Sequence, residues 1–132
     1  MDEKTEDETK IIIADDHRFM RKVLRHVFSR TGDMRVVAEA HNADEVFQLV
    51  DRQDADVLVL DLNLPGKDGL QILRQLQATK RNVPVVVLTL FPLERFKEEV
   101  MQLGAADFLT KDCQPEELVE AVRKAKEAGC MT

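Results

Sequence analysis

The sequence predicts one α/β domain in which a doubly wound parallel sheet carries helices on both faces. Short apolar runs alternate along the chain with longer segments whose apolar residues recur at helical spacing. The apolar runs are continuous, as expected of parallel strands that are buried on both faces. A chain of 132 residues with 44% hydrophobic residues can bury one core of ordinary size, and nothing in it asks for a second domain.

The predicted strands follow an acidic arm. Residues 1–9 hold five acids and no large apolar residue after Met1, which indicates a disordered segment. The folded domain is therefore predicted over residues 10–129. Its strands are the runs KIIIA at 10–14, MRVVA at 34–38, DVLVL at 56–60, VPVVVL at 83–88 and AADFL at 105–109.

Helices are predicted between the strands and after the last one. The first ends before Gly32 and the fourth before Gly104, where a left-handed residue can close a helix. Asn42 and Glu45 resemble a capping box at the start of the second helix. Pro115 fits the first turn of the fifth, where its missing N–H costs nothing.

The strand order follows from the connections. Right-handed crossovers with helices on both faces favour the flavodoxin-like order 2-1-3-4-5 for such a (βα)5 chain. In sheets of this kind a ligand site lies beyond the carboxyl ends of the strands, near the reversal of order between the first and third strands.

Polar residues end the strands at that edge. They are Asp15, Asp16, Asp61, Thr89 and Lys111. A single aspartate after a strand is usually a helix cap or turn former, but caps do not need to cluster at one edge. Two carboxylates about 4 Å apart repel by roughly 4 kcal/mol at an effective dielectric constant of about 20, so the cluster requires a cation. All-oxygen ligands at a shallow site favour Mg²⁺ over Ca²⁺.

This set of groups suits phosphoryl transfer. A carboxylate can attack phosphorus to form an aspartyl phosphate, while Mg²⁺ and Lys111 neutralise the phosphoryl oxygens and Thr89 hydrogen-bonds one of them. Asp61 ends the central strand and is the predicted acceptor.

Four motifs together resemble the receiver domain of two-component response regulators. They are IIIADDH at 11–17, VLVLDLNLPGKDGL at 57–70, VVVLT at 85–89 and GAADFLTKD at 104–112. The resemblance covers about residues 10 to 128 in a single register. Its details look most like the NarL/FixJ type, whose receivers usually precede a helix-turn-helix DNA-binding domain.

The resemblance implies a metal site and a phosphoacceptor. Asp61 would accept the phosphoryl group from a histidine kinase or a phosphotransfer protein, and the domain itself would catalyse the transfer and its own dephosphorylation. Asp16 would bind Mg²⁺ directly, Asp15 would complete the acidic pocket, and Asn63 would lend its backbone carbonyl to the metal.

The resemblance also implies a switch. Thr89 would move toward the phosphoryl group held by Lys111, and Phe108 would turn inward. The surface around the fourth helix and the fifth strand would then change and control an output partner, with transcription as the expected output. Receivers commonly form homodimers or output contacts through the fourth helix, fifth strand and fifth helix, or through the first and fifth helices.

Several residues depart from the receiver pattern. Leu90 follows Thr89 where many receivers carry a small residue, so slower entry of phosphodonors is expected. Phe91 and Pro92 replace a polar helix start, which favours a stiffer switch segment. The chain stops at Thr132, where a linker would begin, so no effector domain is expected in it and DNA would be reached only through a missing domain.

Other side chains receive simpler interpretations. His17 is predicted to be a polar residue of the first helical turn rather than a metal ligand. The basic residues of the first helix form a solvated face by default, with docking to an acidic partner surface as the alternative. They are Arg18, Arg21, Lys22 and Arg25.

Composition limits location and partners. A net charge of -6 argues against direct nucleic-acid binding, and no apolar stretch of about 18 residues predicts a membrane span. Two cysteines without zinc or disulfide spacing suit a reducing, cytoplasmic compartment.

Other functions remain as alternatives. A phosphorylation-independent protein-interaction module would keep this fold and use the site little. A haloacid-dehalogenase-type phosphatase fits poorly, since it needs a second aspartate two residues after Asp61, where Asn63 stands. A cobalamin- or flavin-binding module lacks the glycine that would admit a cofactor tail near Asp16.

Overall fold

The structure is a computed structural model that describes residues 8–52, 54–79, 83–90 and 94–130. Its five strands form one parallel sheet in the order β2-β1-β3-β4-β5, which confirms the predicted fold. The elements are β1 Thr9–Ala14, α2 Arg18–Ser29, β2 Met34–Ala40, α3 Ala43–Arg52, β3 Val57–Asp61, α4 Gly69–Ala78, β4 Val85–Thr89, α5 Glu94–Gln102, β5 Asp107–Thr110 and α6 Pro115–Cys130.

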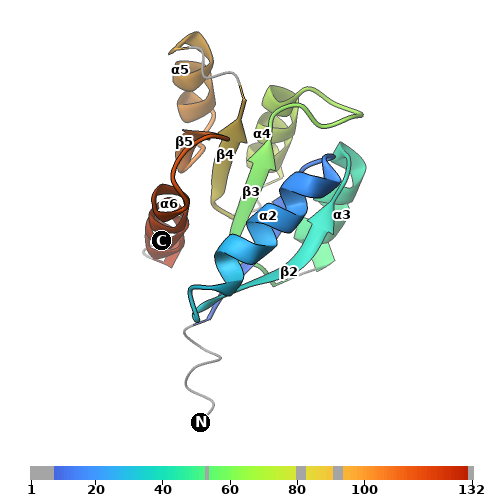
Figure 1. The fold of residues 1–132 in the computed structure, drawn as a ribbon. Helices are drawn as coiled ribbons and strands as arrows, with labels where there is room; N and C mark the ends of the chain where they lie inside the picture. Colours follow the sequence, from blue (N-terminus) through green and yellow to red (C-terminus); the bar gives the residue numbers. More distant parts are fainter. Residues whose placement is uncertain (1–7, 53, 80–82, 91–93, 131–132) are drawn as a thin grey trace.

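Helices cover both faces of the sheet (Figure 1). Leu24 and Phe28 of α2 pack with Leu118 and Val122 of α6 on one face, while α3, α4 and α5 pack on the other. Successive residues of a central strand enter alternate layers: Ile11 and Ile13 face α2 and α6, whereas Ile12 and Ala14 face α3 and α4. This two-sided burial explains why the strands read as continuous apolar runs.

The folded domain begins earlier than predicted. Thr9 is 4% exposed and pairs with Met34 in the first register position of β1 and β2. The carboxylate of Glu8 lies 3.2 Å from Nε of Arg35. Residues 8 and 9 therefore belong to the fold and not to the acidic arm, because a polar residue at a strand start can be buried through its backbone pairing. Residues 1–7 of the predicted arm lie outside the described residues.

Helix ends follow the sequence signals with one change. The Asn42 side chain accepts a hydrogen bond from the Glu45 N–H (2.9 Å), as predicted. The Glu45 carboxylate, however, accepts from the N–H of His41 (2.6 Å) rather than from that of Asn42. A complete capping box instead opens α4, with Asp68 as N-cap and Gln71 returning the second bond.

The glycines and the proline predicted at helix boundaries are found there. Gly32 has φ 83° and Gly104 has φ 95°, the left-handed conformation expected after a helix. Pro115 is the first residue of α6. With 16 residues, α6 is the longest helix in the described ranges, and none of the helices there is long and apolar enough to cross a membrane.

Candidate functional site

The carboxyl ends of β1 and β3 bring three aspartates together. Asp61 is the last residue of β3, and Asp15 directly follows β1, whose Ala14 pairs with Leu60. Ligand atoms of Asp15, Asp16, His17 and Asp61 all lie within 4.8 Å of one another. Asp15 and Asp61 are buried, whereas the side chain of Asp16 is 35% exposed. The site is thus a buried pair of carboxylates with a third at its mouth.

Lys111 is the counterion of the buried pair. Its Nζ lies 2.9 Å from Oδ2 of Asp15 and 3.1 Å from Oδ2 of Asp61, and its side chain is 7% exposed. Burial alone would lower the pKa of Lys111, but the hydrogen bond to Asp15 and the charges of Asp61 and Asp15 outweigh it and raise that pKa. Lys111 therefore carries its charge throughout the physiological range.

Thr89 reaches the same edge through the sheet register. It ends β4, it is 3% exposed, and its neighbour Leu88 pairs with Asp61. Its carbonyl oxygen accepts a hydrogen bond of 2.7 Å from the N–H of Lys111. This bond holds the backbones of Thr89 and Lys111, which carry the predicted hydroxyl and ammonium groups, next to each other.

Asn63 lies in the loop between β3 and α4. Its N–H donates to Oδ1 of Asp61 (3.0 Å), so the two oxygens of Asp61 have different partners, Asn63 and Lys111. Asn63 also borders an open hollow of about 610 Å³ along this loop. The loop is tied to α3 by a 3.1 Å hydrogen bond from the N–H of Ala43 to the carbonyl of Pro65. These contacts hold the Asn63 backbone beside the carboxylates.

The contacts of His17 with Asp15 and Asp16 were not predicted from the sequence. His17 is the N-cap residue of α2 rather than part of the first turn, and its N–H donates to Oδ1 of Asp15 (2.8 Å). Its Nδ1 lies 3.1 Å from Oδ1 of Asp15 and 3.2 Å from Oδ1 of Asp16. The position of His17 two residues after Asp15 could have predicted the backbone contact, since an aspartate side chain commonly accepts a hydrogen bond from the N–H two residues ahead.

Two predicted residues lie away from the carboxylates. Phe108 of β5 is 7% exposed and packs in the core layer that includes Val87 and Val100. Leu90 follows Thr89 and is 55% exposed. Phe91 and Pro92 lie outside the described residues.

The donor set fits Mg²⁺. Three carboxylates face one ammonium, so a divalent cation would balance the remaining charge. Carboxylate oxygens are hard ligands, and the exposed Asp16 leaves room for metal-bound waters, which Mg²⁺ usually retains. Asp16, Asp61 and the Asn63 carbonyl would hold the ion, with Asp15 behind them.

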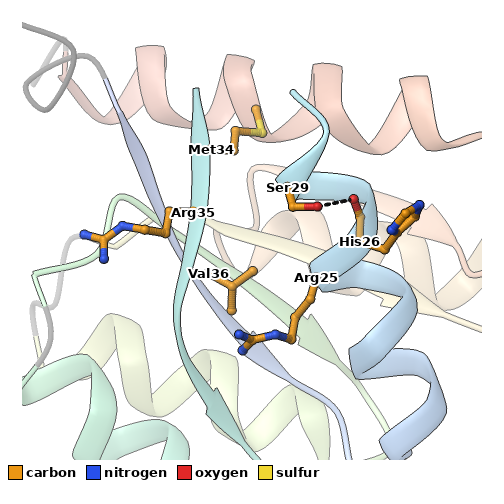
Figure 2. Close-up of a pocket in the computed structure, with 6 residues that line it drawn as sticks. All are labelled: Arg25, His26, Ser29, Met34, Arg35 and Val36. Atoms are coloured by element: carbon orange, nitrogen blue, oxygen red, sulfur yellow. Dashed lines mark hydrogen bonds between the residues drawn. The ribbon is translucent and has the colours of Figure 1, made fainter. Parts of the chain in front are cut away.

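A separate groove of about 370 Å³ lies between α2 and β2 (Figure 2). Two of its lining residues are arginines that already meet carboxylates: Arg25 pairs with Glu39, and Arg35 pairs with Glu8. Ser29 donates to the carbonyl of His26 (2.8 Å) along its wall. Both arginines of this groove thus have an acidic partner within the chain.

Cys113 follows Lys111 by two residues, and it should react slowly. Its burial, together with the charges of Glu117 and Asp112, raises the pKa of the thiol and so lowers its thiolate fraction. We expect iodoacetamide to alkylate Cys113 more slowly than free cysteine at the same pH, as followed by peptide mass spectrometry. The variant Asp112→Asn should react faster, and a native rate equal to that of free cysteine would contradict the prediction.

Comparisons with known proteins show to which family the chain belongs. The family model for the response regulator receiver domain matches residues 11–123. The chain is 31% identical over 119 residues to the uncharacterized transcriptional regulatory protein YxjL of Bacillus subtilis, covering 90% of this chain and 55% of that protein. It is 33% identical over 115 residues to the nitrate/nitrite response regulator protein NarL of Escherichia coli K12, covering 87% of this chain and 53% of NarL.

The fold of a solved receiver domain agrees with this family assignment. The signal receiver domain of the putative response regulator NarL from Mycobacterium tuberculosis superposes with a TM-score of 0.86 at 27% identity, covering 92% of this chain and 98% of that domain. The chain spans about half the length of YxjL and NarL, at 55% and 53%. This chain therefore belongs to the family of response regulator receiver domains and is of the NarL type.

Proposed function

We propose that this receiver accepts a phosphoryl group on Asp61 with Mg²⁺ in the acidic pocket. The observation that carries the proposal is the environment of Asp61, whose side chain is 1% exposed and has one oxygen bound by Asn63 and the other by Lys111. A carboxylate oriented in this way between a peptide N–H and an ammonium is a positioned nucleophile.

The transfer step follows from these groups. An oxygen of Asp61 attacks the phosphorus of a phosphohistidine, the new O–P bond forms as the N–P bond breaks, and the released imidazole nitrogen takes up a proton from solvent. Lys111 then exchanges its contact with Asp61 for the phosphoryl oxygens, and Thr89 donates its hydroxyl to another of them. Bound Mg²⁺ supplies the remaining charge neutralisation.

The phosphodonor is a histidine kinase or a phosphotransfer protein that docks near α2. Phe19, at the start of this helix, is 78% exposed, and its neighbours Arg18 and Lys22 are also exposed. An apolar side chain between two cations, close to Asp16, suits a partner with an apolar surface and an acidic rim.

The output is control of transcription in the cytoplasm. The named relatives are transcriptional or nitrate/nitrite response regulators about twice as long as the matched region, so DNA would be bound by a separate effector domain and not by this one. Movement of Thr89 toward the phosphoryl group, with Phe108 following, would carry the signal to α5 and β5.

A second copy of the chain is a further partner. An open groove of about 630 Å³ lies between α2 and α6. The α2 side offers Arg30 and Val27, while the α6 side offers Val119, Glu116 and Glu120. Arg30 at the end of α2 faces two acids of α6 across this groove, while Arg123 of α6 is already paired with Asp33, and an apolar residue lies on each side. This arrangement suits a two-fold dimer in which α2 of each copy meets α6 of its partner. The surface of α5, β5 and α6 is the alternative interface.

Phosphorylation at Asp61 can be tested with acetyl phosphate and Mg²⁺. We expect intact-mass spectrometry to show a gain of one phosphoryl group in the wild type and none in Asp61→Asn. The control Asp54→Asn removes a fully exposed carboxylate and should be modified like the wild type. Equal gain in Asp61→Asn would place the acceptor elsewhere, and no gain in the wild type would favour the phosphorylation-independent interaction module.

A further inference from the structure

Arg21 of α2 connects three parts of the domain beside the acidic pocket. Its Nη1 donates to the backbone carbonyl of Asp15 (2.9 Å), and its Nε donates to Oε1 of Glu39 in β2 (3.0 Å). Its side chain is 11% exposed. The guanidinium thus ties the start of α2 to the edge strand and to the loop that carries the carboxylates.

The guanidinium of Arg21 pairs with Glu39, which it shares with Arg25. Glu39 is 23% exposed and binds Arg21 with one oxygen and Arg25 with the other. The two arginines differ, because Arg25 is 55% exposed and extends from α2 toward Val36 of β2 (Figure 2). Arg21 is the member of this trio that donates to the backbone of the pocket, so Glu39 and Arg21 form the inner pair and Arg25 the outer one.

The contacted carbonyl belongs to the peptide that joins Asp15 to Asp16. Because a peptide unit is planar, fixing the direction of the Asp15 carbonyl also fixes the direction in which the Cα of Asp16 leaves the peptide. Nearby contacts restrain Asp15 more than Asp16. The N–H of Asp15 bonds to Ala40 (3.1 Å), and its carboxylate meets Lys111 and His17, whereas the carboxylate of Asp16 meets the exposed imidazole of His17 (3.2 Å). Arg21 supplies the restraint on the carbonyl side.

We propose that Arg21, oriented by Glu39, is a positioning residue that holds Asp16 in place to bind Mg²⁺. The inference rests on the proposed Mg²⁺ site. Residues that orient metal ligands typically change metal affinity by about 10- to 100-fold when altered. Arginine suits this role because its planar fork donates in two fixed directions, which the single ammonium of a lysine cannot reproduce.

Charge and positioning predict opposite effects on Mg²⁺ binding. A cation beside the pocket repels Mg²⁺, so removing only its charge would strengthen Mg²⁺ binding. Losing the fixed peptide direction would weaken it. The variant Arg21→Lys keeps the positive charge but loses the planar guanidinium, whereas Arg21→Gln loses both. The matched control Arg25→Gln removes the other positive charge that pairs with Glu39 and leaves the contact with the Asp15 carbonyl in place.

Thermal unfolding in EDTA first shows whether each variant is folded. Each folded variant is then titrated with MgCl₂ alone, and amide NMR shifts measure its Mg²⁺ affinity. We expect Arg21→Lys and Arg21→Gln to bind Mg²⁺ about tenfold more weakly than the wild type, and Arg25→Gln to bind as the wild type does. With acetyl phosphate, the Arg21 variants should need more Mg²⁺ for half-maximal rate but reach the wild-type rate at saturation. If an Arg21 variant does not fold, Glu39→Gln should show the same weakening.

Two results would overturn the inference. They are a Mg²⁺ affinity of Arg21→Lys within twofold of the wild type, or tighter binding by Arg21→Gln. Failure of the underlying Mg²⁺ site is a different result, since the wild type itself would then show no saturable shifts and Asp16→Asn would behave identically to it.

Discussion

Replacing Lys111 with methionine is expected to lower the free energy of unfolding by about 3 kcal/mol in the absence of Mg²⁺. The change leaves Asp15 and Asp61, whose side chains are 2% and 1% exposed, without the ammonium that lies about 3 Å from both. Each carboxylate keeps one backbone donor, the N–H of His17 for Asp15 and that of Asn63 for Asp61. These two bonds keep the loss near the lower end of the range for a broken buried ion pair.

Mg²⁺ should reverse much of this loss. A divalent cation bound to the same carboxylates replaces the missing charge, so Mg²⁺ should stabilise Lys111→Met more than it stabilises the wild type. Urea unfolding in EDTA and in saturating MgCl₂ measures both quantities. In the control Lys10→Met the lost pair involves the fully exposed Asp54, and its midpoint should stay near that of the wild type. Equal responses of Lys111→Met and the wild type to Mg²⁺ would contradict the prediction.

The pH dependence of this stabilisation has a definite sign. The folded protein raises the pKa of Lys111, so the contribution of its charged form is complete below the pKa of an unfolded lysine. It is lost as pH rises through the higher pKa of the folded state. On the alkaline side, the stability difference between the wild type and Lys111→Met should therefore persist until strongly alkaline pH, which urea unfolding at a series of pH values measures.

The parallel sheet could be predicted because its central strands are buried on both faces, and the strand order then followed from right-handed crossovers. Residues such as Ile12 and Ile13 enter opposite layers, so the central strands contain continuous apolar runs and cannot be confused with amphipathic strands. The carboxyl-edge rule then placed Asp15, Asp61 and Lys111 at one crevice, and the structure brings them within hydrogen-bond distance.

The contacts of Arg21 could not be predicted, because they depend on an irregularity in the sheet. Between Ile11 and Ile12 the register of β1 against β2 shifts by one residue, so Ile13 lies opposite Glu39 rather than Ala38. A one-residue shift moves every later side chain of a strand to the other face. Because of this β-bulge, the side chain of Glu39 lies on the α2 side of the sheet, where it pairs with Arg21.

Replacing Gly69 with alanine should both destabilise the domain and weaken its binding of Mg²⁺. A Cβ at Gly69 would lie 2.6 Å from Cδ2 of Leu62 and 2.7 Å from the Cα and carbonyl oxygen of Leu62. Rotation of a side chain cannot relieve the backbone contacts, so the segment between Asp61 and Asn63 must move. We expect a loss of about 2 kcal/mol in the free energy of unfolding, typical of an overpacked site.

The effect on Mg²⁺ binding distinguishes a displaced loop from a general loss of stability. Gly69 donates its N–H to the carbonyl of Leu62 (3.2 Å), so any movement of Leu62 is passed to the adjoining Asn63 backbone, the proposed metal ligand. The control Gly32→Ala meets no atom within 4 Å, but its φ of 83° is strained for alanine, which should cost about 1 kcal/mol without changing Mg²⁺ affinity. Urea unfolding and MgCl₂ titration of both variants test this. Unchanged Mg²⁺ affinity in Gly69→Ala, or equal weakening in Gly32→Ala, would show that the close approach of Gly69 to Leu62 does not position the metal-binding loop.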